Sequence, residues 1–203
     1  MKLYSLDDER NPFPDLFTTL ERVKSISEIK RDGVLILWGG ADIFPGMYNE
    51  KPNRFCYSYQ KSDRDIREEA AILYCIKHDI PMIGICRGAQ LLCVKAGGRL
   101  MQHIEDHATS HNVTLHDEGG AIIKCNSSHH QMMMPPDGSK VLATAGQTYG
   151  INGDNNAVKI PVVPEVVWLP HITALCIQPH PEWTTSPVLF NAYCERKIKE
   201  YIL

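Results

Sequence analysis

The chain has 203 residues and a formal net charge of −3, with 43% hydrophobic and 22% charged residues. This length and composition suit a single globular domain, residues 1–203, with a substantial buried core. The slightly acidic balance argues against a broad nucleic-acid-binding face, and no apolar run is long enough to span a bilayer.

The N-terminal segment, residues 1–15, is charged and contains an early proline, and it lacks the apolar core of a signal peptide. We therefore expect a chain that starts near Met1 and a cytoplasmic location. The first 32 residues carry no motif that indicates a function.

The following stretch alternates apolar runs with an amphipathic segment. Residues 34–38 read VLILW, a continuous apolar run typical of a strand buried on both faces, and residues 81–85 (PMIGI) form a second such run. Between them, residues 63–78 carry apolar side chains at helical spacing, and Ser62 is placed to cap that helix. Strands and helices in this order predict an α/β fold, with a mainly parallel central sheet flanked by helices.

The second half of the chain is richer in strands. Residues 90–96 predict a helix that stops at Gly97 and Gly98, and residues 187–201 predict a closing amphipathic helix. Clusters of Asn, Gly and Pro separate five candidate strands. These strands are residues 113–115, 121–125, 141–145, 166–169 and 174–178.

One of the seven cysteines has distinctive surroundings. Most of them lie among apolar neighbours and are interpreted as core residues, whereas Cys86 stands in Gly-Ile-Cys-Arg-Gly between a predicted strand and a predicted helix. This is the thiol counterpart of the G-x-S-x-G elbow. The helix N-terminus and the Arg87 charge would favour the thiolate, and the Arg87 N–H would face an oxyanion. The motif alone fits a buried cysteine beside a tight turn equally well.

A histidine that could serve Cys86 follows the last predicted strand. His180 precedes Pro181, which pushes its backbone toward an extended conformation. In an extended segment residues two apart project to the same side, so Glu182 can hold one ring nitrogen and leave the other for the thiol. Without Cys86, the same residues would be interpreted as a proline-stiffened surface loop.

The residues around Cys86 and His180 resemble a known family. Residues 84–92 (GICRGAQLL) are similar to the nucleophile signature of class I glutamine amidotransferases, and residues 178–182 (QPHPE) to their His-Pro-Glu motif. More narrowly, residues 39–48, residues 126–131 (NSSHHQ) and Trp183 resemble the γ-glutamyl-γ-aminobutyrate hydrolases. Pro179 and residues 146–164 depart from the family pattern. These departures lie where the specificity for the leaving group could be set.

The resemblance implies a flavodoxin-like three-layer sandwich and a cysteine hydrolase of γ-glutamyl amide bonds. Such an enzyme forms a γ-glutamyl thioester and releases glutamate and an amine, without a cofactor. The implied triad is Cys86, His180 and Glu182, and the implied oxyanion N–H groups belong to Gly40 and Arg87. Residues implied to lie at the substrate are Gln90, His111, Asn126 and Ser127.

Three other interpretations stay open. A glutaminase subunit would cleave glutamine and pass ammonia to a synthetase partner, which this chain has no room to contain. A binding protein without activity is disfavoured because all three triad residues are present. A metal-binding module would use the crowded histidines, but the Gly, Asn and Thr around His111 argue against one helix that holds them, so we expect no metal site. The sequence leaves the oligomeric state and the amine open.

Overall fold

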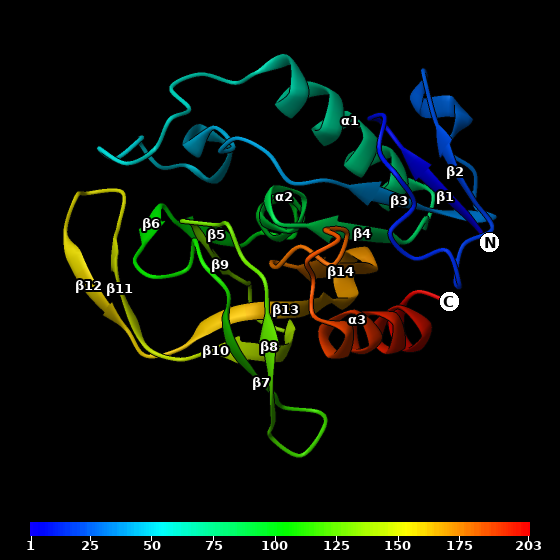
Figure 1. The fold of residues 1–203 in the computed structure, drawn as a ribbon. Coiled ribbons are helices and arrows are strands. Elements are labelled where there is room, and N and C mark those ends of the chain that lie inside the picture. Colours follow the sequence, from blue (N-terminus) through cyan, green and yellow to red (C-terminus); the bar gives the residue numbers. More distant parts are fainter.

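The computed structural model describes all residues from 1 to 203 (Figure 1). A nine-stranded sheet has the strand order β2-β1-β3-β4-β14-β13-β10-β7-β8. Its strands are β1 (Lys2–Ser5), β2 (Thr19–Arg22), β3 (Gly33–Leu37), β4 (Met82–Ile85), β7 (His111–Leu115), β8 (Ala121–Cys125), β10 (Lys140–Ala145), β13 (Val163–Leu169) and β14 (Ala174–Ile177). The helices are α1 (Asp63–Lys77), α2 (Arg87–Lys95) and α3 (Val188–Tyr201). None of these helices combines the length and the apolar character that a bilayer crossing requires.

The direction of the strands divides the sheet into two halves. The five strands β2, β1, β3, β4 and β14 run parallel to their neighbours, whereas each pairing from β14 through β13, β10 and β7 to β8 is antiparallel. Leu37 pairs with Gly84, and Ile85 with Ile177. The segments after β3, β4 and β14 therefore leave one edge side by side, where α/β proteins place their ligands.

The sheet separates two layers of helices, as the sequence pattern predicts. Figure 1 shows α1 and α2 over one face and α3 over the other. Alternate residues of β3 serve the two cores: Leu35 and Leu37 pack with α1 and α2, and Val34 and Ile36 pack with α3. The result is a three-layer α/β sandwich whose central strands are buried on both faces.

The predicted helix ends are largely correct. Ser62 caps α1, accepting from the Asp65 N–H at 3.1 Å, while the Asp65 carboxylate accepts from the Ser62 N–H at 2.9 Å. Helix α2 begins at Arg87 rather than at residue 90, because the turn at Cys86 leads directly into it. Gly97, with a φ of +96°, follows its end.

Several strands are absent from the sequence-based prediction. The motif-free N-terminal segment supplies β1 and β2 at the edge of the sheet. Two small sheets pack beside the main one: β5 (Arg99–Met101) with β9 (Met132–Met134), and β6 (His103–Ile104) with β11 (Thr148–Ile151) and β12 (Ala157–Ile160). Single turns of 3₁₀ helix lie at Ile26–Glu28, Pro45–Tyr48 and Pro170–Ile172.

Candidate active site

Cys86 occupies a strained turn between β4 and α2. Its φ of 50° and ψ of −110° fall in a region that L-residues rarely adopt, at a cost of about 1–3 kcal/mol. The Cys86 N–H donates to the Ile177 carbonyl at 2.8 Å, which ties the turn to β14. A Cβ at Gly84 would lie 2.5 Å from the Ala89 nitrogen, so only glycine lets β4 and α2 approach this closely. The turn holds the thiol at the edge where three loops meet.

His180 and Glu182 are in contact as predicted, but through a turn and not an extended segment: the Trp183 N–H donates to the His180 carbonyl at 3.3 Å. The His180 Nδ1 is 2.7 Å from the Glu182 Oε1, and the indole of Trp183 stacks on the imidazole with ring centroids 4.0 Å apart. Gly39 lies against both reactive groups: a Cβ there would be 2.9 Å from the His180 Cε1 and 3.5 Å from the Cys86 Cβ. The loop after β3 therefore closes over the contact between thiol and imidazole.

The surroundings of His180 favour its protonated form. Burial lowers the pKa of the imidazole, but the hydrogen bonds to Cys86 and Glu182 outweigh that effect and raise the pKa to about 9. The imidazole thus holds a proton beside the Cys86 sulfur at neutral pH. Such a proton can be given to a departing amine.

Asn126 holds the backbone of His180. Its Nδ2 donates to the His180 carbonyl at 2.7 Å, and its Oδ1 accepts from the His180 N–H at 3.1 Å. The neighbouring Ser127 donates its hydroxyl proton to the His107 carbonyl. Both residues are expected at the substrate through the family resemblance; the contacts seen here position His180 and the 107 loop.

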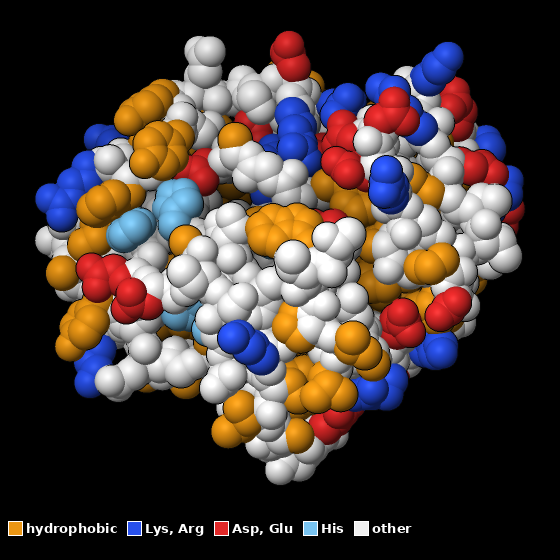
Figure 2. Space-filling model, viewed as in Figure 1, with side chains coloured by type: hydrophobic (Ala, Val, Ile, Leu, Met, Phe, Trp, Pro, Cys, Tyr) orange, Lys and Arg blue, Asp and Glu red, His pale blue; other side chains and the backbone are white.

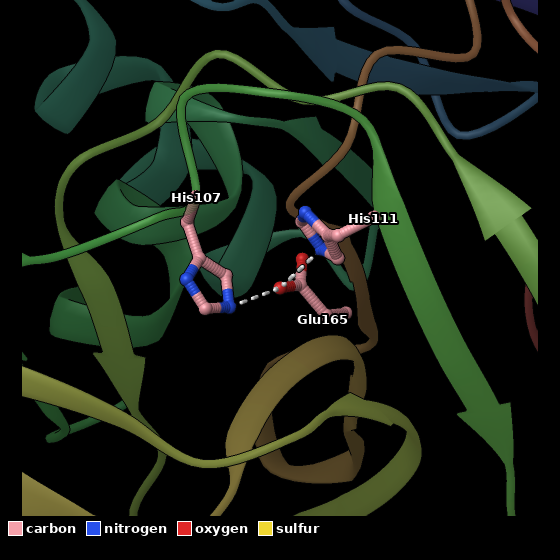
Figure 3. A group of neighbouring side chains, drawn as sticks. All are labelled: His107, His111 and Glu165. Carbon is pink, nitrogen blue, oxygen red and sulfur yellow. Dashed lines mark hydrogen bonds and ion pairs between the residues drawn. The ribbon is translucent and has the colours of Figure 1, made fainter.

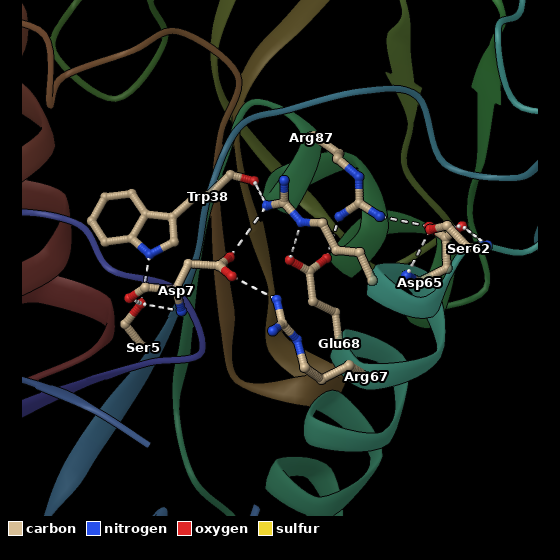
Figure 4. Close-up of polar contacts among 9 residues, drawn as sticks. Ser5, Asp7, Trp38, Ser62, Asp65, Arg67, Glu68 and Arg87 are labelled. Atoms are coloured by element: carbon tan, nitrogen blue, oxygen red, sulfur yellow. Dashed lines mark hydrogen bonds and ion pairs between the residues drawn. The ribbon is translucent and has the colours of Figure 1, made fainter. Parts of the chain in front are cut away.

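Arg87 belongs to a network of ion pairs behind the turn (Figure 4). Its guanidinium pairs with Asp65 at 2.5 Å and with Glu68, both on α1 and both fully buried. Arg64 also pairs with Glu68, at 2.8 Å, and donates to the Trp38 carbonyl at 3.1 Å. The Arg87 guanidinium is therefore neutralised by two carboxylates of α1. This corrects the expectation that the Arg87 charge stabilises a thiolate at Cys86.

The two groups expected to bind an oxyanion lie on adjoining loops. Arg87 is the first residue of α2, where a backbone N–H has no acceptor within the helix. Gly40 follows β3 with a φ of +152°, a conformation that favours glycine, and Arg64 packs against its Cα. The roles of Gly40 and Arg87 toward an oxyanion stay predictions.

Gln90 and His111 are engaged by other protein groups. The Gln90 Nε2 donates to the Gln178 Oε1 at 3.2 Å and to the Gln131 carbonyl at 3.3 Å. The His111 Nε2 lies 3.1 Å from the Glu165 Oε1. Their roles as substrate contacts also stay predictions.

A cavity of about 540 Å³ opens beside His180. It is lined by Gly39, Gly40 and Trp183 and by the charged residues 8–10 of the N-terminal segment. A second cavity, of about 500 Å³, is lined by Arg64 and Arg87 and by the exposed Tyr57 and Tyr59. The N-terminal segment carries no recognisable motif, so its place at the site emerges only in the fold.

Residues 39–48, which contribute to the family resemblance, lie only partly at the surface. Tyr48 packs in the core beneath α1 and α2. Tyr57 and Tyr59 of the following segment are exposed instead, and Tyr57 meets His130 edge-on. The partly buried Phe55 stacks on His103 with centroids 4.0 Å apart. Figure 2 shows histidine side chains beside hydrophobic ones on this face of the molecule.

Comparisons with known proteins agree with this architecture. Residues 19–152 match the peptidase C26 family. A glutamine amidotransferase-like protein from Lactococcus lactis is 28% identical over 158 residues, which cover 66% of each chain. The chain thus spans just under two thirds of that relative's length.

Two further relatives match over more of the chain. The γ-glutamyl-γ-aminobutyrate hydrolase of Escherichia coli O157:H7 is 27% identical over 200 residues, covering 84% of this chain and 75% of that protein. A crystal structure from Thermoplasma acidophilum, described as a candidate component of a GMP synthase, covers 98% of both chains with a TM-score of 0.63 and 17% identity. At that identity the likeness concerns the fold alone.

Proposed function

The chain belongs to the peptidase C26 family of class I glutamine amidotransferase-like proteins, and from this premise we propose that it is a cysteine hydrolase of γ-glutamyl amides. The observation that carries the proposal is the strained turn that presents Cys86 to the His180 imidazole, itself held by Glu182 at 2.7 Å. Family membership supports a hydrolase role; the triad and the substrate are our inference.

The reaction begins at the γ-carbonyl of the substrate. The Cys86 sulfur, whose proton has passed to His180, attacks this carbon, and the oxyanion that forms accepts hydrogen bonds from the N–H groups of Gly40 and Arg87. His180 then gives its proton to the departing amine, and a γ-glutamyl thioester remains. Water that loses a proton to His180 attacks the thioester, releases glutamate and restores the thiol. One amide and one water thus yield glutamate and one amine.

The remaining cysteines are poor nucleophiles, which supports the assignment of Cys86. Cys86 is 7% exposed, whereas each of the other six thiol residues is at most 1% exposed. Burial raises the pKa of the Cys75 thiol to about 12, and it does the same for Cys93. Limiting iodoacetamide followed by peptide mapping should therefore label Cys86 first. Preferential labelling of Cys56 or Cys125 contradicts the assignment.

The leaving group is set by the cavity beside His180. Trp183 stacks on the catalytic imidazole and is 40% exposed, so its free face can pack on the amine portion of a substrate. The charged residues 8–10 also line this cavity. We infer an amine larger than ammonia, as the name of the E. coli relative also indicates.

In the deciding experiment, glutamine and a panel of γ-glutamyl amines are each added to the purified protein, and the release of glutamate is measured. We expect turnover of a γ-glutamyl amine well above that of glutamine, and none by Cys86→Ala. Cys56→Ala, a thiol outside the site, serves as the matched control and keeps its activity. Activity on glutamine alone, or only after a co-purifying partner is added, would replace this proposal with the glutaminase-subunit interpretation.

A further inference from the structure

A second group of titratable side chains lies apart from Cys86 and takes no part in the proposed reaction. Three imidazoles surround the carboxylate of Glu165, which is fully buried on β13 (Figure 3 draws two of them). The His111 Nε2 is 3.1 Å and the His107 Nε2 3.8 Å from the Glu165 Oε1. The His129 Nε2 is 3.4 Å from the other oxygen, Oε2. We call these four residues the Glu165 cluster.

In each of the three rings, the Nδ1 atom is hydrogen-bonded to a backbone carbonyl, and the Nε2 atom faces Glu165. The Nδ1 atoms of His107, His111 and His129 lie 2.8, 3.0 and 2.9 Å from the carbonyls of Glu105, Thr109 and Gln131, in that order. A carbonyl only accepts hydrogen bonds, so each Nδ1 carries a proton. In a neutral imidazole the Nε2 then presents a lone pair, and all three lone pairs converge on a negatively charged carboxylate.

This arrangement sets one carboxylate against three imidazole nitrogens. One proton on one imidazole would balance Glu165 but leave the other two Nε2 atoms facing the carboxylate as bare acceptors. The Nε2 atoms of His107 and His129 and the Oε2 of Glu165 are in fact buried without a hydrogen-bond partner. Buried polar atoms in this state are rare and costly, so several of them aimed at one point indicate a missing cation.

We propose that the Glu165 cluster binds a divalent transition-metal ion, and zinc is the ion that suits it best. The ligands would be His107, His111, His129 and Glu165. The ligand atoms of His107, His111 and Glu165 already lie within 4.8 Å of one another. Bonds to zinc of about 2.0–2.1 Å require these atoms to move closer together, and the His129 Nε2, 3.4 Å from the Glu165 Oε2, would move in as the fourth ligand. Imidazole suits zinc, and rings held through Nδ1 by carbonyls are the usual support of metal-bound histidines.

The proposal reverses the expectation of no metal site, and the reason lies in the topology. That expectation required one continuous helix to hold the histidines. The fold instead collects them from the loop before β7, the first residue of β7 and the loop after β8, and places them around a strand residue more than thirty positions away. Four protein ligands in a buried position are the pattern of a structural rather than a catalytic zinc site.

The metal would fasten the segments that position the reaction centre. His129 lies in the same loop as Asn126, whose side chain holds both backbone groups of His180. The Glu165 carbonyl accepts from the Gln178 N–H at 2.8 Å, two residues before His180. The ion would therefore act as a positioning element for His180 and not as a participant in the chemistry.

The test is metal content in protein purified without a histidine tag. We expect stoichiometric zinc by mass spectrometry after dialysis, or after adding zinc and dialysing again, and a tetrahedral cobalt spectrum on substitution. His107→Gln and Glu165→Gln should each bind zinc at least about tenfold more weakly, as supporting groups of metal sites already do on mutation. His116→Gln, which removes a histidine bound to Thr144 outside the cluster, is the matched control and keeps its zinc.

A measurement on the unchanged chain protects the test against variants that fail to fold. Zinc in excess should raise the Tm of the wild-type protein by several degrees relative to EDTA, because an ion that binds only the folded state stabilises it. Wild-type protein that takes up no zinc and shows no shift in Tm overturns the proposal. So does zinc retained in full by both folded cluster variants.

Discussion

Two histidine–carboxylate groups in this chain use the same chemical parts in different ratios. At His180 one imidazole meets one carboxylate, and the ring also contacts a thiol and a cavity of about 540 Å³. At Glu165 three imidazoles meet one carboxylate that is fully buried. A single pair beside a cavity can exchange protons with a substrate, whereas three imidazoles around one buried anion leave unpaired nitrogens that suit the proposed cation. Number and access, rather than residue type, separate the two roles.

The largest expected effect separates the two groups by activity. His180→Asn should lower kcat/KM for the accepted γ-glutamyl amide by at least about a thousandfold, because general acid–base catalysis is lost. His129→Asn should lower it by only about tenfold, since that residue acts only through the position of His180. Steady-state kinetics of both variants beside wild type measure the ratio. Equal losses would erase the distinction between the groups.

Arg87 with Asp65 and Glu68 forms a third buried ionic group, in which the protein itself supplies the cation. It can be compared with the Glu165 cluster, where a metal ion would supply it. Arg87→Met leaves Asp65 and Glu68 buried without their cation and should lower the free energy of unfolding by about 3–5 kcal/mol. Arg67→Met removes a half-exposed pair with Asp7 and should cost about 0–1 kcal/mol. Urea titrations with and without EDTA should give the same loss for Arg87→Met, in contrast to Glu165→Gln. A loss for Arg87→Met that EDTA abolishes would contradict this contrast.

The next effect concerns pH and the pair at His180. Because its folded pKa is raised to about 9 from an ordinary value of 6.5, its contribution to stability is complete below pH 6.5 and fades as the pH rises through 9. Glu182→Gln should reduce that contribution by about 1–2 kcal/mol at pH 6 and by almost nothing at pH 10. Unfolding free energies of both proteins across this range give the difference. A difference that grows with pH would have the wrong sign.

The smallest effect tests the aromatic cover of His180. Trp183→Ala removes the ring that stacks on the imidazole at 4.0 Å, and such contacts contribute about 0.5–1.5 kcal/mol. We expect a rise in KM for γ-glutamyl amines of up to about tenfold with little change for glutamine. Trp168→Ala, a ring that packs on Tyr201 away from the site, controls for general loss of packing. An equal rise for glutamine would exclude Trp183 from leaving-group recognition.

Local sequence patterns account for the parallel half of the sheet and for the relation of His180 to Glu182. Continuous apolar runs such as residues 34–38 specify strands buried on both faces, and Ser62 with Asp65 specifies where α1 begins. The short spacing of His180 and Glu182 keeps them in contact, although the segment between them is a turn and not the extended backbone that the sequence predicts. These features depend on near neighbours in the chain, so the sequence is enough to predict them.

The packing of distant segments, by contrast, settles which groups share a charge. Arg87 turns from the thiol to Asp65 and Glu68 because α1 packs against α2, a pairing that no local pattern encodes. The edge strands β1 and β2 and the place of residues 8–10 at the cavity likewise follow from the packing of the whole chain. The Glu165 cluster is the clearest case, because strand order brings four residues between positions 107 and 165 to one buried point. Burial then turns ordinary polar side chains into groups that require a partner.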